Sequence, residues 1–257
     1  MKKFKKLIPA LCMLLVSAVL VGTSTYAWFS MNDTVSVTNL QITAKSDSVF
    51  LLIGEGKQTA GEVQAGNKTN IDTEAKGELL PSAHVADVST EAKAAAEDAW
   101  YYQKAKDPTS SVGDGTNVTI TTDKFGNYVI KKTYSLTLAS GSLAQNKIDA
   151  QVVITDANDK TAADRTFDPV RVLITTAEKS AEFGVKADAN NTDLKVAGTS
   201  ADNKGASATI HEGAVNDTTV IEVNVYIYYN GADTNVFTTN IAKLAGGNIS
   251  VYFTVAK

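Results

Sequence analysis

The feature that most constrains the fold is a two-residue alternation of apolar and polar side chains in short segments along the whole chain. Successive side chains of a β-strand point to opposite faces, so this alternation predicts strands with one face in a core. Clusters of Gly, Asn, Asp and Ser separate the segments and predict turns. Many short strands joined by polar turns predict an all-β fold, a jelly-roll-like antiparallel sandwich. The segments are 35–42 (with a change of parity, and hence a bulge, near Asn39), 49–53, 118–120, 128–138, 148–155, 169–176, 223–229 and 249–255.

One segment departs from this pattern. Residues 89–106 are rich in Ala, Glu and Lys, which favour helices. Ser89 is a suitable N-cap and Pro108 follows the end of the segment. The sequence therefore predicts one helical insert over about 89–106, with Trp100 and Tyr101 packed against the sandwich.

Two other segments, 54–77 and 187–205, are polar and contain glycines, so we expect them to be long surface loops. The only cysteine of the chain is Cys12, which excludes disulfides from the remainder. A chain of this length without disulfides is long enough to be held by one hydrophobic core. We therefore expect residues 28–257 to form a single β-sandwich domain.

The first 27 residues have the composition of a signal peptide. Lysines dominate residues 1–6, an apolar run follows over 7–22, and Thr25 and Ala27 fit the two positions that a signal peptidase recognises. We expect cleavage after Ala27, so that the exported chain begins at Trp28. An uncleaved membrane anchor is the alternative, but the apolar run is short for a span of about 20 residues.

The charge of the expected mature chain excludes some partners. The four lysines of the first six residues are the only charges before residue 28, and without them 20 basic and 28 acidic residues give a formal charge of −8. Binding to phosphate groups requires clustered Lys and Arg, so a nucleic acid is not an expected partner. Binding to an anionic membrane surface after cleavage is not expected for the same reason.

A search for catalytic and metal-binding motifs yields no site. The two histidines, His84 and His211, are far apart and belong to no His-Glu-x-x-His motif. Gly141-Ser142 lacks the other residues of a nucleophile elbow. The segments 156–159 and 188–190 resemble the start of a calcium loop without its later Gly and Glu. We predict no catalytic residue, no metal site and no cofactor; a weak calcium site in these loops is an alternative.

The expected new N-terminus is unusually apolar. Every second residue from position 29 to position 37 is apolar except Asp33; the apolar residues are Phe29, Met31, Val35 and Val37. An exposed segment of this kind needs a surface to cover it. It could be the first strand of its own sandwich, or it could add as a strand to a neighbouring subunit. Repeated head to tail, the second arrangement gives an open filament.

Two parts of the sequence resemble the TasA and camelysin family. The run Gly22-Thr23-Ser24-Thr25-Tyr26-Ala27-Trp28-Phe29-Ser30 is similar to the signal-peptide boundary of that family, which uses a dedicated signal peptidase. The strand-like segment 223–229 is followed by Asn-Gly-Ala-Asp, Phe-Thr-Thr-Asn and a last β segment, which is also similar. The resemblance implies a jelly-roll subunit of extracellular matrix fibres in Gram-positive bacteria. It assigns the role of donor strand to Trp28, Phe29, Ser30, Met31, Asn32, Asp33, Thr34, Val35, Ser36 and Val37.

Some members of that family are labelled metalloproteases, but without a zinc motif we do not carry this activity over. We therefore expect a secreted structural subunit of biofilm matrix fibres, not an enzyme, that assembles head to tail through its N-terminal donor strand. Its expected partners are copies of itself and, during export, a signal peptidase. A monomeric cell-surface adhesin or carbohydrate-binding β-sandwich is the alternative, and a secreted hydrolase is a third hypothesis.

Overall fold

The computed structural model describes residues 40–45, 50–66, 70–73, 79–105, 113–156, 169–185, 191–232 and 247–256. The chain divides into two units, Met1–Ser36 and Val37–Lys257, and every described residue belongs to the second. Several predictions therefore lie outside the described residues. They include the signal peptide 1–27 with its cleavage site at Ala27 and Trp28, the donor strand 28–37, the bulge near Asn39 and, except for Asp156, the possible calcium-loop segments 156–159 and 188–190.

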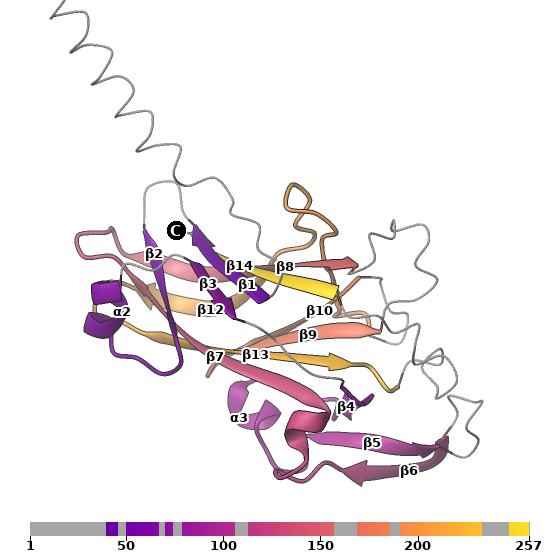
Figure 1. The fold of residues 1–257 in the computed structure, drawn as a ribbon. Helices are drawn as coiled ribbons and strands as arrows, with labels where there is room; N and C mark the ends of the chain where they lie inside the picture. The colour runs from indigo at the N-terminus through magenta and orange to yellow at the C-terminus, as the bar shows by residue number, and fades with distance from the viewer. Residues whose placement is uncertain are drawn as a thin grey trace, which may run out of the picture. The chain divides into compact units, whose positions relative to one another are not determined.

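The first sheet of the sandwich has five strands in the order β12-β8-β14-β1-β3 (Figure 1). Neighbouring strands are antiparallel except β1 and β14, which are parallel. Two register shifts interrupt the pairing of the edge strand β12 with β8. The strands are β1 (Leu40–Lys45), β3 (Asn70–Thr73), β8 (Gln145–Asp156), β12 (Ala208–Val215) and β14 (Gly247–Ala256).

The second sheet has six strands in the order β11-β10-β9-β13-β7-β2. Here only β10 and β11 are parallel neighbours. The strands are β2 (Leu51–Glu55), β7 (Val129–Leu138), β9 (Val170–Thr175), β10 (Ser180–Gly184), β11 (Lys195–Val196) and β13 (Ile221–Tyr229).

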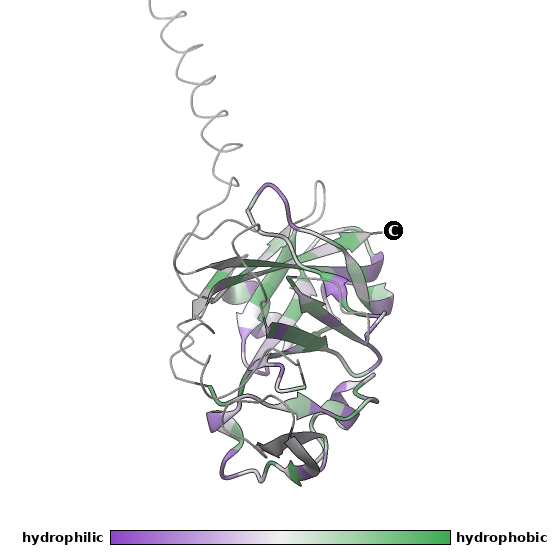
Figure 2. Cartoon of the chain, turned by 90° about the vertical axis from the view of Figure 1, so that its right-hand side faces the viewer, coloured by the Kyte–Doolittle hydropathy of each residue, from purple (hydrophilic) through white to green (hydrophobic). Residues whose placement is uncertain are grey.

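The main core lies between the two sheets. It is built from the apolar residues at alternate positions of each strand, and hydrophobic residues are green in Figure 2. Large side chains from both sheets are fully buried there. Examples are Ile42, Tyr134, Leu136, Ile148, Phe183, Val225 and Phe253, each with 0% of its surface exposed. The predicted all-β sandwich is therefore confirmed, and its strands are predominantly antiparallel.

A third, smaller sheet packs against the outer face of the second sheet. It has the order β4-β5-β6, with β4 (Ala83–His84), β5 (Trp100–Ala105) and β6 (Gly113–Thr119). A short helix α3 (Glu91–Ala94) precedes β5, and a 3-10 turn η1 (Phe125–Asn127) precedes β7. Together with Tyr226 and Tyr228 of β13, residues of these elements form a second apolar cluster centred on Trp100.

Two sequence-based expectations differ from the structure. The helical insert expected over 89–106 is present only as α3, and Trp100–Ala105 is a strand. Aromatic residues favour strands, and the pairing of β5 with β6 outweighs the helix propensity of the preceding alanines. The expected loop over 54–77 contains helix α2 (Ala60–Gly66) and strand β3. The expected loop over 187–205 contains the two-residue strand β11.

Candidate functional site

The first feature to place is the start of β1, because the predicted donor strand precedes it in the chain. β1 is an internal strand, paired with β14 on one side and β3 on the other. Its residue Ile42 is fully buried, and Gln41 is 7% exposed. Gln41 lies opposite Ser250 of β14, and Ser250 lies opposite Val153 near the end of β8. The chain therefore enters β1 at the end of the sandwich where β8 finishes.

A buried polar cluster joins the third sheet to the second, and it contains one of the two histidines. The Nε2 atom of His84 on β4 lies 3.5 Å from Oε1 of Glu182 on β10. The Tyr228 hydroxyl donates to the same oxygen, and Asn191 Nδ2 donates to Oε2 at 2.7 Å. The side chains of His84 and Glu182 are only 13% and 12% exposed. The contact is thus a largely desolvated pair between two separate sheets.

Electrostatics within this cluster favour the charged pair. Burial of the ring works to lower the pKa of His84, but the hydrogen bond and charge of Glu182 and the hydrogen bond to the Val85 carbonyl raise it above its ordinary value. Burial likewise works to raise the pKa of Glu182, yet His84, the Tyr228 hydroxyl and the charge of Arg171 hold it below its ordinary value. Burial and the neighbouring Glu182 raise the pKa of Tyr228 well above its usual range, so it stays a neutral donor.

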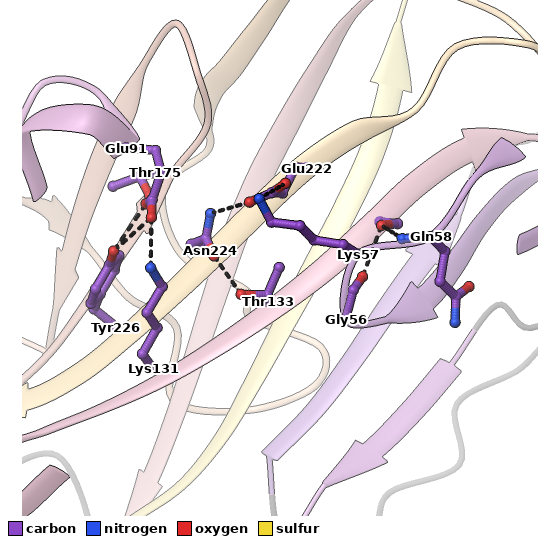
Figure 3. A network of polar contacts seen from close by, with 11 residues as sticks. Gly56, Lys57, Gln58, Glu91, Lys131, Thr133, Thr175, Glu222, Asn224 and Tyr226 are labelled. Atoms are coloured by element: carbon purple, nitrogen blue, oxygen red, sulfur yellow. Dashed lines mark hydrogen bonds and ion pairs between the residues drawn. The ribbon is translucent and has the colours of Figure 1, made fainter. Parts of the chain in front are cut away.

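A second carboxylate, that of Glu91, anchors α3 to the same sheet (Figure 3). The Tyr226 hydroxyl donates to its two oxygens at 2.9 and 3.0 Å, and Lys131 Nζ lies 2.7 Å from Oε1. The Thr175 hydroxyl also donates to Glu91, and the Glu91 backbone N–H donates to the Thr176 carbonyl. Three strands, β7, β9 and β13, thereby converge on one side chain.

The polar contacts continue along the outer face of β13 and β7 (Figure 3). Asn224, which is 1% exposed, accepts a hydrogen bond of 2.6 Å from the Thr133 hydroxyl. Glu222 pairs with Lys57 at 2.9 Å, although the lysine side chain is 78% exposed. The Ser135 hydroxyl donates to the Gly56 carbonyl at 2.8 Å. These contacts hold the residues after β2 against the sheet, so they stabilise the fold.

The other histidine, His211, lies on β12 of the first sheet and not near His84. Its Nδ1 atom is 3.2 Å from Glu178 Oε2, while its Nε2 atom is buried without a hydrogen-bond partner among the described residues. Within the described ranges no group of three or more His, Cys, Asp or Glu side chains is placed to hold a metal ion. Sequence reasoning missed the glutamate partners of both histidines. His84 and Glu182 are 98 positions apart in the chain, and no local sequence pattern indicates that two such distant residues are in contact.

The predicted site residues 28–37 lie outside the described part of the chain. In the described part, no helix combines the length and apolar character that crossing a membrane requires. Comparisons of the chain with models of protein families, with curated proteins and with solved structures find no match.

Proposed function

We propose that this chain is a secreted structural subunit of extracellular matrix fibres, and that it assembles head to tail by donating residues 28–37 to the next subunit. The proposal rests on the N-terminal residues, whose alternation of Phe29, Met31, Val35 and Val37 gives the segment one apolar face. The resemblance of this boundary to the TasA and camelysin family supports the same role.

The observation that carries the proposal is where the body of the protein begins. The unit that contains the sandwich starts at Val37, so nine of the ten residues of the donor segment precede it. The described strands bury their apolar side chains between the two sheets, where Ile42 and Phe253, for example, are fully buried. Donation to a neighbouring subunit requires that the sandwich folds without residues 28–37, and the experiment below tests this requirement directly.

The test is to compare the chain beginning at Trp28 with a chain that lacks residues 28–37. We expect the first to form filaments visible by negative-stain electron microscopy and the second to remain monomeric. Fully burying each large apolar side chain of the donor contributes roughly 1.5–3 kcal/mol, so its removal abolishes a contact of this kind. The far-ultraviolet circular dichroism of the two chains should show the same β content.

The matched control exchanges polar residues on the other parity of the segment, Ser30→Ala with Ser36→Ala, and should still assemble. Unfolding of the truncated chain would mean that the segment is an intrinsic first strand. Filaments formed by the truncated chain would place the donor elsewhere. Either result would overturn the proposal.

A further inference from the structure

Two exposed apolar side chains flank the turn between β7 and β8. Phe50 is 58% exposed and Leu143 is 66% exposed, the highest values among the large apolar residues that the structure describes. The Ala139 N–H donates to the Phe50 carbonyl at 2.8 Å, and the Ser142 N–H donates to the Ala139 carbonyl at 3.0 Å. Phe50 therefore lies beside Ala139 at one end of the turn, and Leu143 follows Ser142 at the other end; we call these two residues the turn-end patch.

The turn itself offers no charge that would oppose an apolar partner. Residues 139–143 read Ala-Ser-Gly-Ser-Leu and carry no charge. Gly141 has a φ of 81°, a conformation that strains other residues, so the turn favours glycine at this position. Each of these two exposed apolar side chains gains stability when an apolar surface covers it.

The turn-end patch and the start of β1 lie at opposite ends of the sandwich. Leu143 precedes the first residue of β8, Gln145, whereas Gln41 of β1 is level with Val153 near the end of that strand. Phe50 precedes Leu51, which pairs with the last residue of β7, Leu138. In Figure 1 the turn between β7 and β8 lies at the left of the sandwich, on the side where β14 ends.

The length of the chain before β1 determines whether residues 28–37 can reach the turn-end patch of their own subunit or only that of another. Residues 28–39, which precede β1, span at most about 40 Å when fully extended. The 12 residues of β8 also extend about 40 Å. The segment would have to reverse direction and run along the whole sandwich for Phe29 to touch its own patch, and Val35 would not reach it. A patch on a second copy has no such limit.

We propose that the turn-end patch binds the apolar face of residues 28–37 from a second copy of this chain. This inference rests on the proposed function and specifies the surface that receives the donor. The contact joins different surfaces of the two copies, so repetition produces an open filament.

The first test uses two complementary variants of the chain beginning at Trp28. One carries Phe50→Asp with Leu143→Asp and retains the donor segment; the other lacks residues 28–37 and retains the turn-end patch. We expect each to be monomeric alone and the mixture to form a one-to-one dimer, measured by sedimentation velocity. Both substituted side chains are exposed, so circular dichroism and the melting temperature should stay unchanged.

The second test separates failure of the patch from failure of the proposed function. A synthetic peptide of residues 28–37 is titrated into the chain lacking that segment, with the fluorescence of Trp28 as the signal after correction for Trp100. The Phe50→Asp, Leu143→Asp pair should weaken binding at least about 100-fold, as expected for two buried apolar groups. Val196→Asp, which places a charge on an apolar residue of β11 that is 40% exposed, should leave it unchanged.

Equal binding of the peptide to the chain with and without the patch substitutions would overturn the patch and leave the proposed function standing. Assembly of the patch variant by itself would do the same. A chain that forms no multimers and whose body binds no peptide would overturn both.

Discussion

At the scale of single residues, the geometry around His84 favours the protonated form of its ring. The ring places Nδ1 2.7 Å from the Val85 carbonyl and Nε2 3.5 Å from a Glu182 oxygen. Both neighbours are acceptors, so only the doubly protonated ring can donate to both. The neutral ring would direct one lone pair at a carbonyl or a carboxylate. The charged group that faces this pair from another strand is Arg171 on β9, and the Tyr228 hydroxyl on β13 donates to Glu182.

This geometry predicts a pH dependence of stability. The raised pKa of His84 means that its contribution is complete below 6.5, the ordinary value, and is lost as the pH rises through the raised value. The lowered pKa of Glu182 means that its contribution is complete above 4.5 and is lost as the pH falls through the lowered value. We expect His84→Gln to destabilise the protein most between about pH 4.5 and 6.5 and progressively less at alkaline pH.

Urea unfolding of the wild type and of His84→Gln at several pH values measures this difference in the free energy of unfolding. His211→Gln is the matched control, because that ring pairs with a Glu178 side chain that is 51% exposed. A difference between wild type and His84→Gln that is the same at pH 5.5 and pH 9 would contradict the assignment.

At the scale of elements, α3 illustrates how one side chain can dock a short helix. Glu91→Ala removes the acceptor shared by Tyr226, Thr175 and Lys131, and Glu91 is only 19% exposed at its side chain. Charge-assisted hydrogen bonds of this kind contribute about 1.5–3 kcal/mol, and we expect a loss of that size in the free energy of unfolding. Glu91→Gln, which keeps an acceptor, should lose less.

The control for this prediction is Glu97→Ala, because Glu97 is an exposed residue in the turn after α3. Its free energy of unfolding should stay within about 0.5 kcal/mol of the wild type. Equal losses for Glu91→Ala and Glu97→Ala in urea unfolding would show that the Glu91 contacts contribute little.

The long strands could be predicted from the sequence because each has one face in the main core. The alternation over 148–155, 223–229 and 249–255 corresponds to β8, β13 and β14. The signal is strong there because every second side chain is apolar. Expected boundaries differ from observed ones by a few residues, since strand ends depend on pairing partners that are distant in the chain.

The segment around Trp100 could not be predicted in the same way. Its alanines, glutamates and lysines favour a helix, and α3 does form over four residues. What ends the helix is tertiary: Trp100 is 2% exposed, stacks on Tyr226 and donates from Nε1 to the Ala94 carbonyl at 2.8 Å. These partners come from β13 and from the helix itself. Packing against residues more than 120 positions away therefore outweighs the local helix propensity of this segment.

At the scale of the whole molecule, the proposed assembly has a direction. Each subunit would offer a donor segment at the end where β1 starts and a turn-end patch at the opposite end. A contact between two unlike surfaces leaves one free donor and one free patch on every filament, whatever its length. A contact between two like surfaces would instead close after two subunits. The two arrangements respond differently to chains that have lost one of the two surfaces.

A chain lacking residues 28–37 should therefore act as a cap. It retains the turn-end patch, so it binds the free donor at one end of a filament, but it offers no donor for the next subunit. Added to the chain beginning at Trp28 during growth, it should shorten filaments in proportion to its share of the mixture, as mass action requires. Negative-stain electron microscopy measures the lengths.

A truncated chain that also carries Phe50→Asp and Leu143→Asp is the control, and it should leave the lengths unchanged because it can neither donate nor accept. Equal shortening by both truncated chains would show that capping does not use the patch, and no shortening by either would show that growth does not proceed by donation from one end to the other.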